Sequence, residues 1–325
     1  MSRTTCDLLV VGAGPTGLYA GFYAGFRGLS TAVVDTLPEP GGQVTAMYPE
    51  KLIYDVAGFP AVRGRDLVDG LVAQAARYEP TYLLGHQAAT LSTHSDGLDV
   101  GLADGGTVHT RAVLITGGLG TFTPRPLPSG DGWAGRGLVH FIPSMAAHAE
   151  QDVVVVGGGD SAFDWALALH PVARSVTLVH RRAKFRAHAG TVDAVKALGV
   201  ELVTDAQVLD FRSDAHGALV GLDVQVDGHV RTLAAQAVVA ALGFTADLGP
   251  ITEWGLDIDH RQITVDSTMR TPRDRVYAAG DICTYPGKVN LIATGFGEAA
   301  TAVNNIAVAL DPDAHLFPGH SSAEG

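Results

Sequence analysis

Two glycine-rich runs carry the residues whose spacing has the clearest chemical meaning. The first is Gly12-Ala13-Gly14-Pro15-Thr16-Gly17, and the second is Gly157-Gly158-Gly159-Asp160-Ser161-Ala162. Each follows an apolar run and precedes a helical pattern, which is the context in which such a run binds a dinucleotide. The glycines let the turn close tightly, and the helix N-terminus directs backbone N–H groups at a pyrophosphate. A tight turn that binds nothing is the alternative for either run taken alone.

The two runs differ at a matched position downstream. Asp35 follows Gly12 by 23 residues, and His180 follows Gly157 by the same 23 residues, leading into Arg181 and Arg182. A carboxylate at this place accepts hydrogen bonds from ribose hydroxyls and repels a 2′-phosphate, whereas guanidinium groups bind phosphate bidentately. The first run therefore favours an unphosphorylated adenosine, as in FAD, and the second favours NADP(H).

Arg186 adds a third cation four residues after Arg182. A solvated basic turn is the alternative reading of residues 180–186. Their place behind the second glycine run favours the NADP(H) interpretation.

The elements that must position these residues form two strand–helix–strand repeats. In each repeat an apolar strand ends at the first glycine, a helix follows, and a second strand ends at the discriminating position. The expected elements are Asp7–Val11, Thr16–Arg27 and Ser30–Val34 in the first repeat, and Asp152–Val156, Ala162–Leu169 and Ser175–Val179 in the second.

This repetition predicts an α/β fold of two Rossmann-like domains, each a three-layer ββα nucleotide-binding unit, with the second inserted in the first. Short alternating strands are expected at Gly97–Leu102 and Leu219–Val226, and proline-rich linkers at Thr123–Pro128 and near Pro250. Residues 1–117 and 245–325 are expected to form the FAD-binding domain with a C-terminal extension, and residues 118–244 the NADPH-binding domain.

Composition excludes several other classes of function. The formal net charge of −12 argues against a nucleic-acid or anionic membrane surface. No apolar run reaches the length of a membrane span, and no signal peptide is evident, so a cytoplasmic protein is expected. The two cysteines, Cys6 and Cys283, form no C-x-x-C motif, and no metal site is expected.

With these pieces placed, the chain resembles the thioredoxin-reductase-like ferredoxin–NADP⁺ reductases from Asp7 to Ser322. The likeness is carried by GAGPTG at 12–17, GGQVTAMYPEKLIYDVAGFP at 41–60, VVGGGDSAFDWA at 155–166, AAGDIC at 278–283 and LIATGFGEAATAVNN at 291–305. Thioredoxin reductases carry a C-x-x-C pair before the second glycine run, whereas residues 137–151 here contain no cysteine. The resemblance therefore implies that electrons leave the flavin for an external one-electron carrier.

The resemblance also implies roles for individual residues around the flavin. Asp281 would contact the ribityl chain and the pyrophosphate region, and Gln43, after Gly42, would contact the flavin. Tyr54 would stack on the isoalloxazine, with Tyr48 as the alternative. Four further residues of the C-terminal part would contact the flavin. Thr294 and Phe296 lie where the last helix opens, with Thr294 near the flavin edge, and His320 and Ser321 lie in the tail, with His320 covering the other flavin face.

The function that the resemblance implies is hydride transfer from NADPH to FAD, followed by transfer of single electrons to ferredoxin or flavodoxin, in a homodimer. No side chain needs to act as acid or nucleophile, because the cofactor carries the chemistry. One alternative is an NADPH-dependent flavin reductase or oxidase acting on a quinone, oxygen or a pathway-specific acceptor. Another is a flavin-holding redox sensor, which would not need Arg181 and Arg182.

Overall fold

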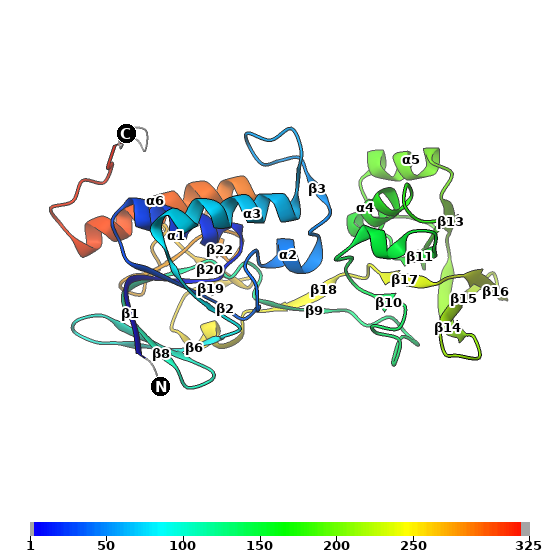
Figure 1. The fold of residues 1–325 in the computed structure, drawn as a ribbon, viewed down its shortest axis with the longest axis horizontal. Coiled ribbons are helices and arrows are strands. Elements are labelled where there is room, and N and C mark those ends of the chain that lie inside the picture. The colour runs from blue at the N-terminus through cyan, green and yellow to red at the C-terminus, as the bar shows by residue number, and fades with distance from the viewer. Residues whose placement is uncertain (1–2, 320–325) are drawn as a thin grey trace. The chain divides into compact units, whose positions relative to one another are not determined.

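The computed structural model describes residues 3–319 of the chain, which divide into two compact units. Unit 1 takes the chain up to Ala46, the segment Leu52–Thr121 and the chain from Ala246 onward; unit 2 takes Met47–Lys51 and Phe122–Thr245. Figure 1 follows the chain through both units by colour.

Unit 1 is built on a seven-stranded sheet with strands in the order β5-β2-β1-β8-β7-β6, and β21 pairs with β8 beyond the end of β7. Strands β5, β2, β1, β8 and β21 run parallel, whereas β6, β7 and β8 form an antiparallel meander. The strands are β1 (Arg3–Val11), β2 (Thr31–Asp35), β5 (Thr81–Leu84), β6 (Ala88–Thr93), β7 (Leu98–Leu102), β8 (Thr107–Ile115) and β21 (Val276–Ala278).

The parallel part of this sheet is covered on both faces, as its sequence requires. Leu8, Leu9 and Val10 of β1 are fully buried in succession, which an unbroken apolar run predicts for a central parallel strand. Three helices pack on one side of the sheet (Figure 1). They are α1 (Pro15–Phe26), α3 (Gly64–Ala75) and α6 (Ile292–Leu310).

The remaining elements of unit 1 are short and connect the layers. The helical ones are α2 (Gln43–Met47), whose last residue belongs to unit 2, η1 (Ala76–Tyr78) and η3 (Gly249–Glu253); the strands are β3 (Leu52–Ile53), β4 (Val62–Arg63), β19 (Ile258–Asp259), β20 (Gln262–Thr264) and β22 (Cys283–Thr284).

Unit 2 repeats the plan of unit 1 at smaller size. A five-stranded parallel sheet has the order β10-β17-β11-β12-β13, and a separate antiparallel sheet has the order β14-β15-β16. The elements are β10 (Leu138–Val139), η2 (Met145–His148), β11 (Asp152–Val156), α4 (Asp160–Leu169), β12 (Ser175–Val179), α5 (Ala189–Ala197), β13 (Glu201–Val203), β14 (Ala206–Ser213), β15 (Leu219–Val226), β16 (His229–Ala234) and β17 (Ala237–Ala240). The expected α/β fold of two Rossmann-like parts is confirmed.

Two paired strands carry the chain between the units. They are β9 (Thr121–Pro124) and β18 (Phe244–Asp247), which form a two-stranded sheet. The second crossing therefore lies before Pro250, which sits inside η3 in unit 1. The crossing that the sequence predicts near Pro250, with a domain boundary between residues 244 and 245, corresponds to β18.

Candidate functional site

The parallel strands of unit 1 end at one common edge, and the predicted site residues follow those ends. Val11 of β1 pairs with Val34 of β2 on one side and with Ile115 of β8 on the other. Ala278 of β21 pairs with Ile115 as well. The first glycine run, Asp35, residues 116–118 and the segment 279–281 therefore gather at the carboxyl edge, where ligands bind in open α/β sheets.

The first glycine run has the shape of a phosphate cradle. A Cβ added to Gly17 would lie 1.8 Å from the Gly12 carbonyl oxygen, and one added to Gly12 would lie 2.7 Å from Thr116, so both positions need glycine for close packing. Gly14, which caps α1, is different, because a Cβ there would meet nothing within 4 Å. Open space therefore lies directly in front of the first turn of α1, where Pro15 and Thr16 begin the helix and backbone N–H groups lack intrahelical partners.

Asp35 ties the end of β2 to this cradle. Its Oδ2 accepts the Ala13 N–H at 2.6 Å, and its Oδ1 accepts the Leu37 N–H at 2.8 Å. A carboxylate oxygen can accept more than one hydrogen bond. Asp35 can therefore hold the loop and still accept hydroxyl donors from a ribose.

The segment 41–43 packs against the first glycine run. The Gly41 N–H donates to the Ala13 carbonyl at 2.8 Å, and a Cβ on Gly42 would lie 3.0 Å from the Gly14 Cα. The Gln43 side chain reaches the next loop, because a Cβ on Gly118 would lie 3.2 Å from Gln43 Nε2. Gly42 and Gln43 thus stand beside the open space in front of Gly14.

The segment that contains Asp281 packs against both helices of the site. A Cβ on Gly280 would lie 2.9 Å from Thr16 Oγ1, and a Cβ on Gly295 would lie 2.3 Å from the same atom. Thr16, Gly280 and Gly295 therefore meet, and they bring Asp281 and the start of α6 to the first glycine run. Burial, the largest effect, raises the pKa of Asp281, nearby Glu298 raises it further and Lys288 opposes both.

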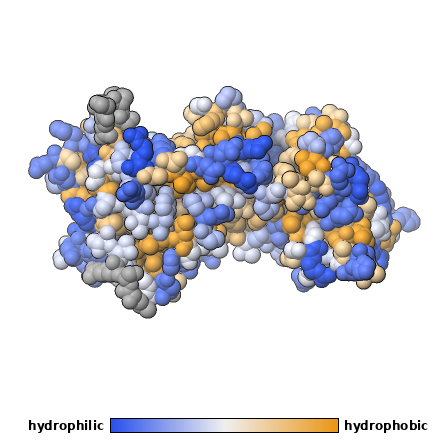
Figure 2. Space-filling view, viewed as in Figure 1, coloured by the Kyte–Doolittle hydropathy of each residue, from blue (hydrophilic) through white to orange (hydrophobic). Residues whose placement is uncertain are grey.

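The two tyrosines proposed for stacking have different surroundings. Tyr54 follows β3, and 70% of its surface is exposed. Figure 2 shows hydrophobic residues at the surface around the β3 loop. Tyr48 instead belongs to unit 2 and packs against its hydrophobic core. An exposed ring is available to a flat cofactor, so the geometry favours Tyr54, and the role of either ring stays a prediction.

The C-terminal residues of the predicted site are only partly within the described chain. Thr294 lies in the first turn of α6, which begins at Ile292 and so opens slightly earlier than expected. The Phe296 ring packs on Tyr19 of α1, with ring centroids 5.2 Å apart. His320 and Ser321 lie outside the described residues.

Unit 2 reproduces the cradle at its own carboxyl edge. Val156 pairs with Val179 and with Ala240, so the second glycine run stands beside the strand end that precedes His180. A Cβ on Gly157 would lie 2.5 Å from the Ala241 carbonyl oxygen and 2.9 Å from the Ala162 Cβ, whereas one on Gly159 would meet nothing within 4 Å. Gly159 caps α4, and exposed Asp160 and Ser161 form its first turn.

The basic loop after β12 is fastened to this second cradle. The Arg186 N–H donates to the Gly158 carbonyl at 2.7 Å, and the His188 N–H donates to Asp160 Oδ1 at 2.8 Å. The side chains of Arg181, Arg182 and Arg186 are exposed, so their charges are available to a phosphate.

His180 differs from the arginines that follow it. A Cβ on Gly158 would fall 2.3 Å from the His180 ring, and the buried Nε2 of that ring has no hydrogen-bond partner. Burial, followed by the neighbouring arginines, lowers the pKa of His180. The geometry therefore gives His180 a packing position beneath the loop, and its contact with NADP stays a prediction.

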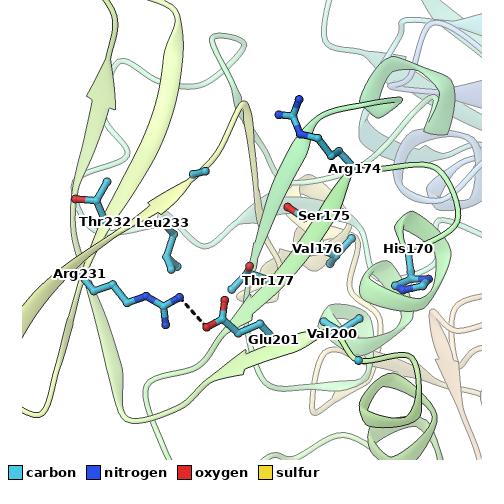
Figure 3. A pocket seen from close by; sticks show the side chains of 12 residues that line it. His170, Arg174, Ser175, Val176, Thr177, Val200, Glu201, Arg231, Thr232 and Leu233 are labelled. Atoms are coloured by element: carbon cyan, nitrogen blue, oxygen red, sulfur yellow. Dashed lines mark ion pairs between the residues drawn. The ribbon is translucent and has the colours of Figure 1, made fainter.

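A cavity of about 450 Å³ lies elsewhere in unit 2 (Figure 3). Its lining includes Arg174, at the amino end of β12, together with Glu201 and Leu233, and Glu201 is paired with Arg231 at 2.7 Å. Arg174 and Glu201 stand at the amino ends of β12 and β13, away from the carboxyl edge that carries the second glycine run, and Arg231 and Leu233 come from β16. The cavity contains none of the predicted nucleotide contacts.

Residues 3–319 also bear on metal binding, membrane insertion and disulfide formation. Within that range, no group of three or more His, Cys, Asp or Glu side chains is arranged to hold a metal ion. None of the described helices is long and apolar enough to cross a membrane. Cys6 and Cys283 are both buried and free, so they do not bridge each other.

Some residues that shape the site were missed in the sequence. Thr116 and Gly117 adjoin Gly12 of the first glycine run, and the signal for them is the glycine-rich stretch Gly117–Gly120 directly after an apolar strand. Lys288 and Glu298 surround Gly280, and no local pattern marks them, because their partners lie at long range.

Comparisons with known proteins agree with this geometry. The family model described as pyridine nucleotide-disulphide oxidoreductase matches residues 6–305. A protein of Saccharopolyspora erythraea named ferredoxin–NADP reductase is 71% identical, covering 98% of each chain. A protein of the same name from Nocardioides is 64% identical over 97% of this chain and 96% of its own.

Solved structures that resemble the chain include thioredoxin reductases. The T. acidophilum thioredoxin reductase has a TM-score of 0.78 at 25% identity, covering 94% of this chain and 99% of its own. The Lactococcus lactis thioredoxin reductase has a TM-score of 0.75 at 22% identity, covering 93% and 97%, and shows the fold alone. Two phosphate cradles, a near full-length family match and these relatives lead to one conclusion: the chain belongs to the pyridine nucleotide-disulphide oxidoreductase family, alongside the bacterial ferredoxin–NADP reductases.

Proposed function

We propose that this protein is an NADPH-dependent ferredoxin–NADP⁺ reductase that holds FAD in unit 1 and NADPH in unit 2. The observation that carries the proposal is the pair of cradles with opposite charge at the matched position. Open space lies before Gly14 and before Gly159, with Asp35 beside the first and exposed arginines behind the second. A bound flavin supplies the hydride acceptor for NADPH and the electrons for a one-electron carrier.

The residues of unit 1 bind and orient the flavin nucleotide. The first-turn N–H groups of α1 and the backbone at Gly12, Gly14 and Gly17 bind the pyrophosphate. Asp35 accepts the ribose hydroxyls, while Gly42, Gln43 and Asp281 line the path toward the ring. Tyr54 would stack on the flavin ring, and a flavin contact from His320 with Ser321, which lie outside the described residues, is proposed from the family resemblance alone. The N-terminus of α6, with Thr294, stabilises negative charge at the flavin edge through its backbone N–H groups.

The residues of unit 2 select and orient NADPH. The backbone at Gly157 and Gly159 and the first turn of α4 bind the pyrophosphate. Arg181 and Arg182 bind the 2′-phosphate by charge-assisted hydrogen bonds, with Arg186 as a third cation.

The electron acceptor in this reaction is ferredoxin. Relatives at 64–71% identity carry the name ferredoxin–NADP reductase, which supports ferredoxin as the acceptor. Flavodoxin as a second carrier, a homodimeric assembly and a cytoplasmic location belong to the same proposal.

The preference for NADPH is tested by anaerobic stopped-flow bleaching of the flavin. NADPH should bleach the flavin faster than NADH does. In a variant with Arg181→Ala and Arg182→Ala the apparent Kd for NADPH should rise about 10- to 100-fold, from the loss of one or two charge-assisted hydrogen bonds, with little change for NADH.

Arg231→Ala is the matched control, since Arg231 lies in the same unit at the cavity of Figure 3. Equal bleaching rates for NADPH and NADH in the wild type would contradict the assignment of unit 2.

The acceptor is tested by steady-state NADPH oxidation with ferredoxin, flavodoxin, a quinone and oxygen in turn. Ferredoxin should give the highest kcat/KM. The net charge of −12 is the observation that favours the competing acceptors, because ferredoxins are acidic as well. A quinone or oxygen that outperforms both carrier proteins would replace ferredoxin, and flavin binding without NADPH oxidation would indicate a redox sensor.

A further inference from the structure

A buried ion pair stands behind the loop that leads to Asp281. Lys288 and Glu298 are ion-paired with side chains 5% and 4% exposed. Removing two charges from water costs more than their attraction returns unless further hydrogen bonds satisfy both groups. A well-packed apolar pair would stabilise the fold at least as well, so a buried pair in this place calls for a second role.

The hydrogen bonds of the pair converge on Gly280. The Gly280 N–H donates to Glu298 Oε2 at 2.7 Å, and the Gly280 carbonyl accepts from Lys288 Nζ at 3.0 Å. The two peptide groups that flank the Gly280 Cα are therefore held from opposite ends of one ion pair. Tyr285 completes the arrangement, because its hydroxyl donates to Glu298 Oε1 at 2.6 Å.

Gly280 is the point at which the chain needs such a clamp. Its φ of +82° lies in the left-handed region, and the peptide group that Lys288 holds is the one that leads into Asp281. Gly280 also packs against Thr16, as does Gly295 of α6. Since Glu298 itself belongs to α6, the pair joins the Asp281 loop to the helix whose N-terminus faces the same site.

We propose that Lys288 and Glu298 are positioning residues of the flavin site. They fix the two peptide groups of Gly280, and thereby hold Asp281 and the N-terminus of α6 in the positions from which they contact the cofactor. The inference rests on the proposed function, since it takes the ligand of unit 1 to be FAD. Lys288 and Glu298 act through Gly280 and Asp281, and neither touches the ligand.

The test separates positioning from simple stabilisation. Lys288→Met and Glu298→Gln are made singly and together, and two quantities are measured: the unfolding temperature of the apoprotein and its Kd for FAD from quenching of flavin fluorescence. Each single variant leaves one buried charge unpaired and should lower the unfolding temperature by roughly 10 °C. Both singles should also bind FAD more weakly.

The double variant decides the question, because it contains no unpaired buried charge. Its unfolding temperature should return to within a few degrees of wild type. Its Kd for FAD should stay at least about tenfold higher, because the Gly280 carbonyl has lost its charged donor. If FAD affinity recovers together with thermal stability, the pair only stabilises the fold and the proposal is overturned.

Two further variants complete the design. Asp274→Asn removes an exposed ion pair with Arg270 in the same unit and should leave both quantities unchanged. Should the double variant not fold, Tyr285→Phe replaces it, because that change removes one hydrogen bond to Glu298 without leaving a charge unpaired. It should raise the Kd for FAD about threefold, and an unchanged Kd would overturn the proposal.

FAD binding by the wild-type protein tests the proposed function separately from the role of the ion pair. A wild-type apoprotein that binds no FAD would remove the proposed function and this inference with it. A wild type that binds FAD and is reduced by NADPH, with variants that bind FAD equally well, would remove only the role of the pair.

Discussion

At the scale of single residues, glycines within one glycine run are required for different reasons. Gly17 is required by close packing, because a Cβ there would collide with the Gly12 carbonyl oxygen. A Cβ on Gly14 would meet no protein atom within 4 Å, so we expect that glycine is needed there to leave room for a bound ligand. Within the six residues from Gly12 to Gly17, Gly17 is therefore needed for folding and Gly14 for ligand binding.

This distinction predicts opposite results for two single methyl groups. Gly14→Ala should fold like the wild type, because the backbone at Gly14, with φ −70°, accepts any residue. It should weaken FAD binding by about tenfold or more, since the methyl group enters the phosphate space. Gly17→Ala should instead lower the free energy of unfolding by about 1–3 kcal/mol through overpacking. Thermal unfolding of the apoprotein and FAD titration measure the two effects, and a stability loss in Gly14→Ala equal to that in Gly17→Ala would refute the distinction.

At the scale of elements, the sequence was most informative where an apolar run met a glycine or a charge. The bounds of β11, β12 and β15 match those expected, because Val-rich runs stop at Gly157, at His180 and at the turn before Gly228. The start of α6 was predicted less closely, because the resemblance placed the opening of this helix at Thr294, whereas the helix begins at Ile292. Side-chain clamps such as Lys288 with Glu298 could not be predicted, because they depend on how distant elements meet.

The buried cluster beside α6 predicts a dependence of stability on pH. Burial, followed by the charge of Glu298, raises the pKa of the Cys283 thiol from its ordinary value near 9 to about 12. The folded state therefore binds this proton more tightly than the unfolded state does. The stability that the protonated thiol contributes is complete below about pH 9 and is lost as pH rises toward 12.

The measurement is the unfolding temperature from pH 7.5 to 10.5 for the wild type and Cys283→Ala (range chosen to span roughly the ordinary thiol pKa). The wild type should lose stability more steeply than Cys283→Ala above about pH 9. Parallel curves would show that Cys283 does not keep its proton in the folded protein.

At the scale of the whole molecule, the chain passes between the two units along the paired strands β9 and β18 and again on either side of the short segment Met47–Lys51. A Cβ on Gly120, just before β9, would lie 2.2 Å from the Asp247 carbonyl oxygen of β18, and Gly120 has φ +77°. The backbones of the two linkers are thus in close contact at this point. Gly120 and Asp247 both belong to unit 1, next to the crossing at Thr121, and we expect this contact to fix the path by which the chain leaves that unit.

Gly120→Ala is therefore expected to slow turnover without removing the flavin. The kcat for NADPH oxidation should fall by up to about 100-fold, as when reacting groups are misplaced by about 1 Å, while the flavin absorption spectrum stays unchanged. Gly132→Ala is the matched control, because Gly132 also has a positive φ but open surroundings. Equal kcat values for the two variants would argue against a special role for the crossing.

The same crossing has a consequence for how such proteins diversify. Unit 2 begins at Phe122 and ends at Thr245, apart from the short segment 47–51, and both ends lie on neighbouring strands. A segment whose ends are adjacent can be exchanged without displacing the termini of its host. Recombination at β9 and β18 would give a descendant a different unit 2, and with it a different electron donor. The flavin-binding residues of unit 1 would be inherited unchanged.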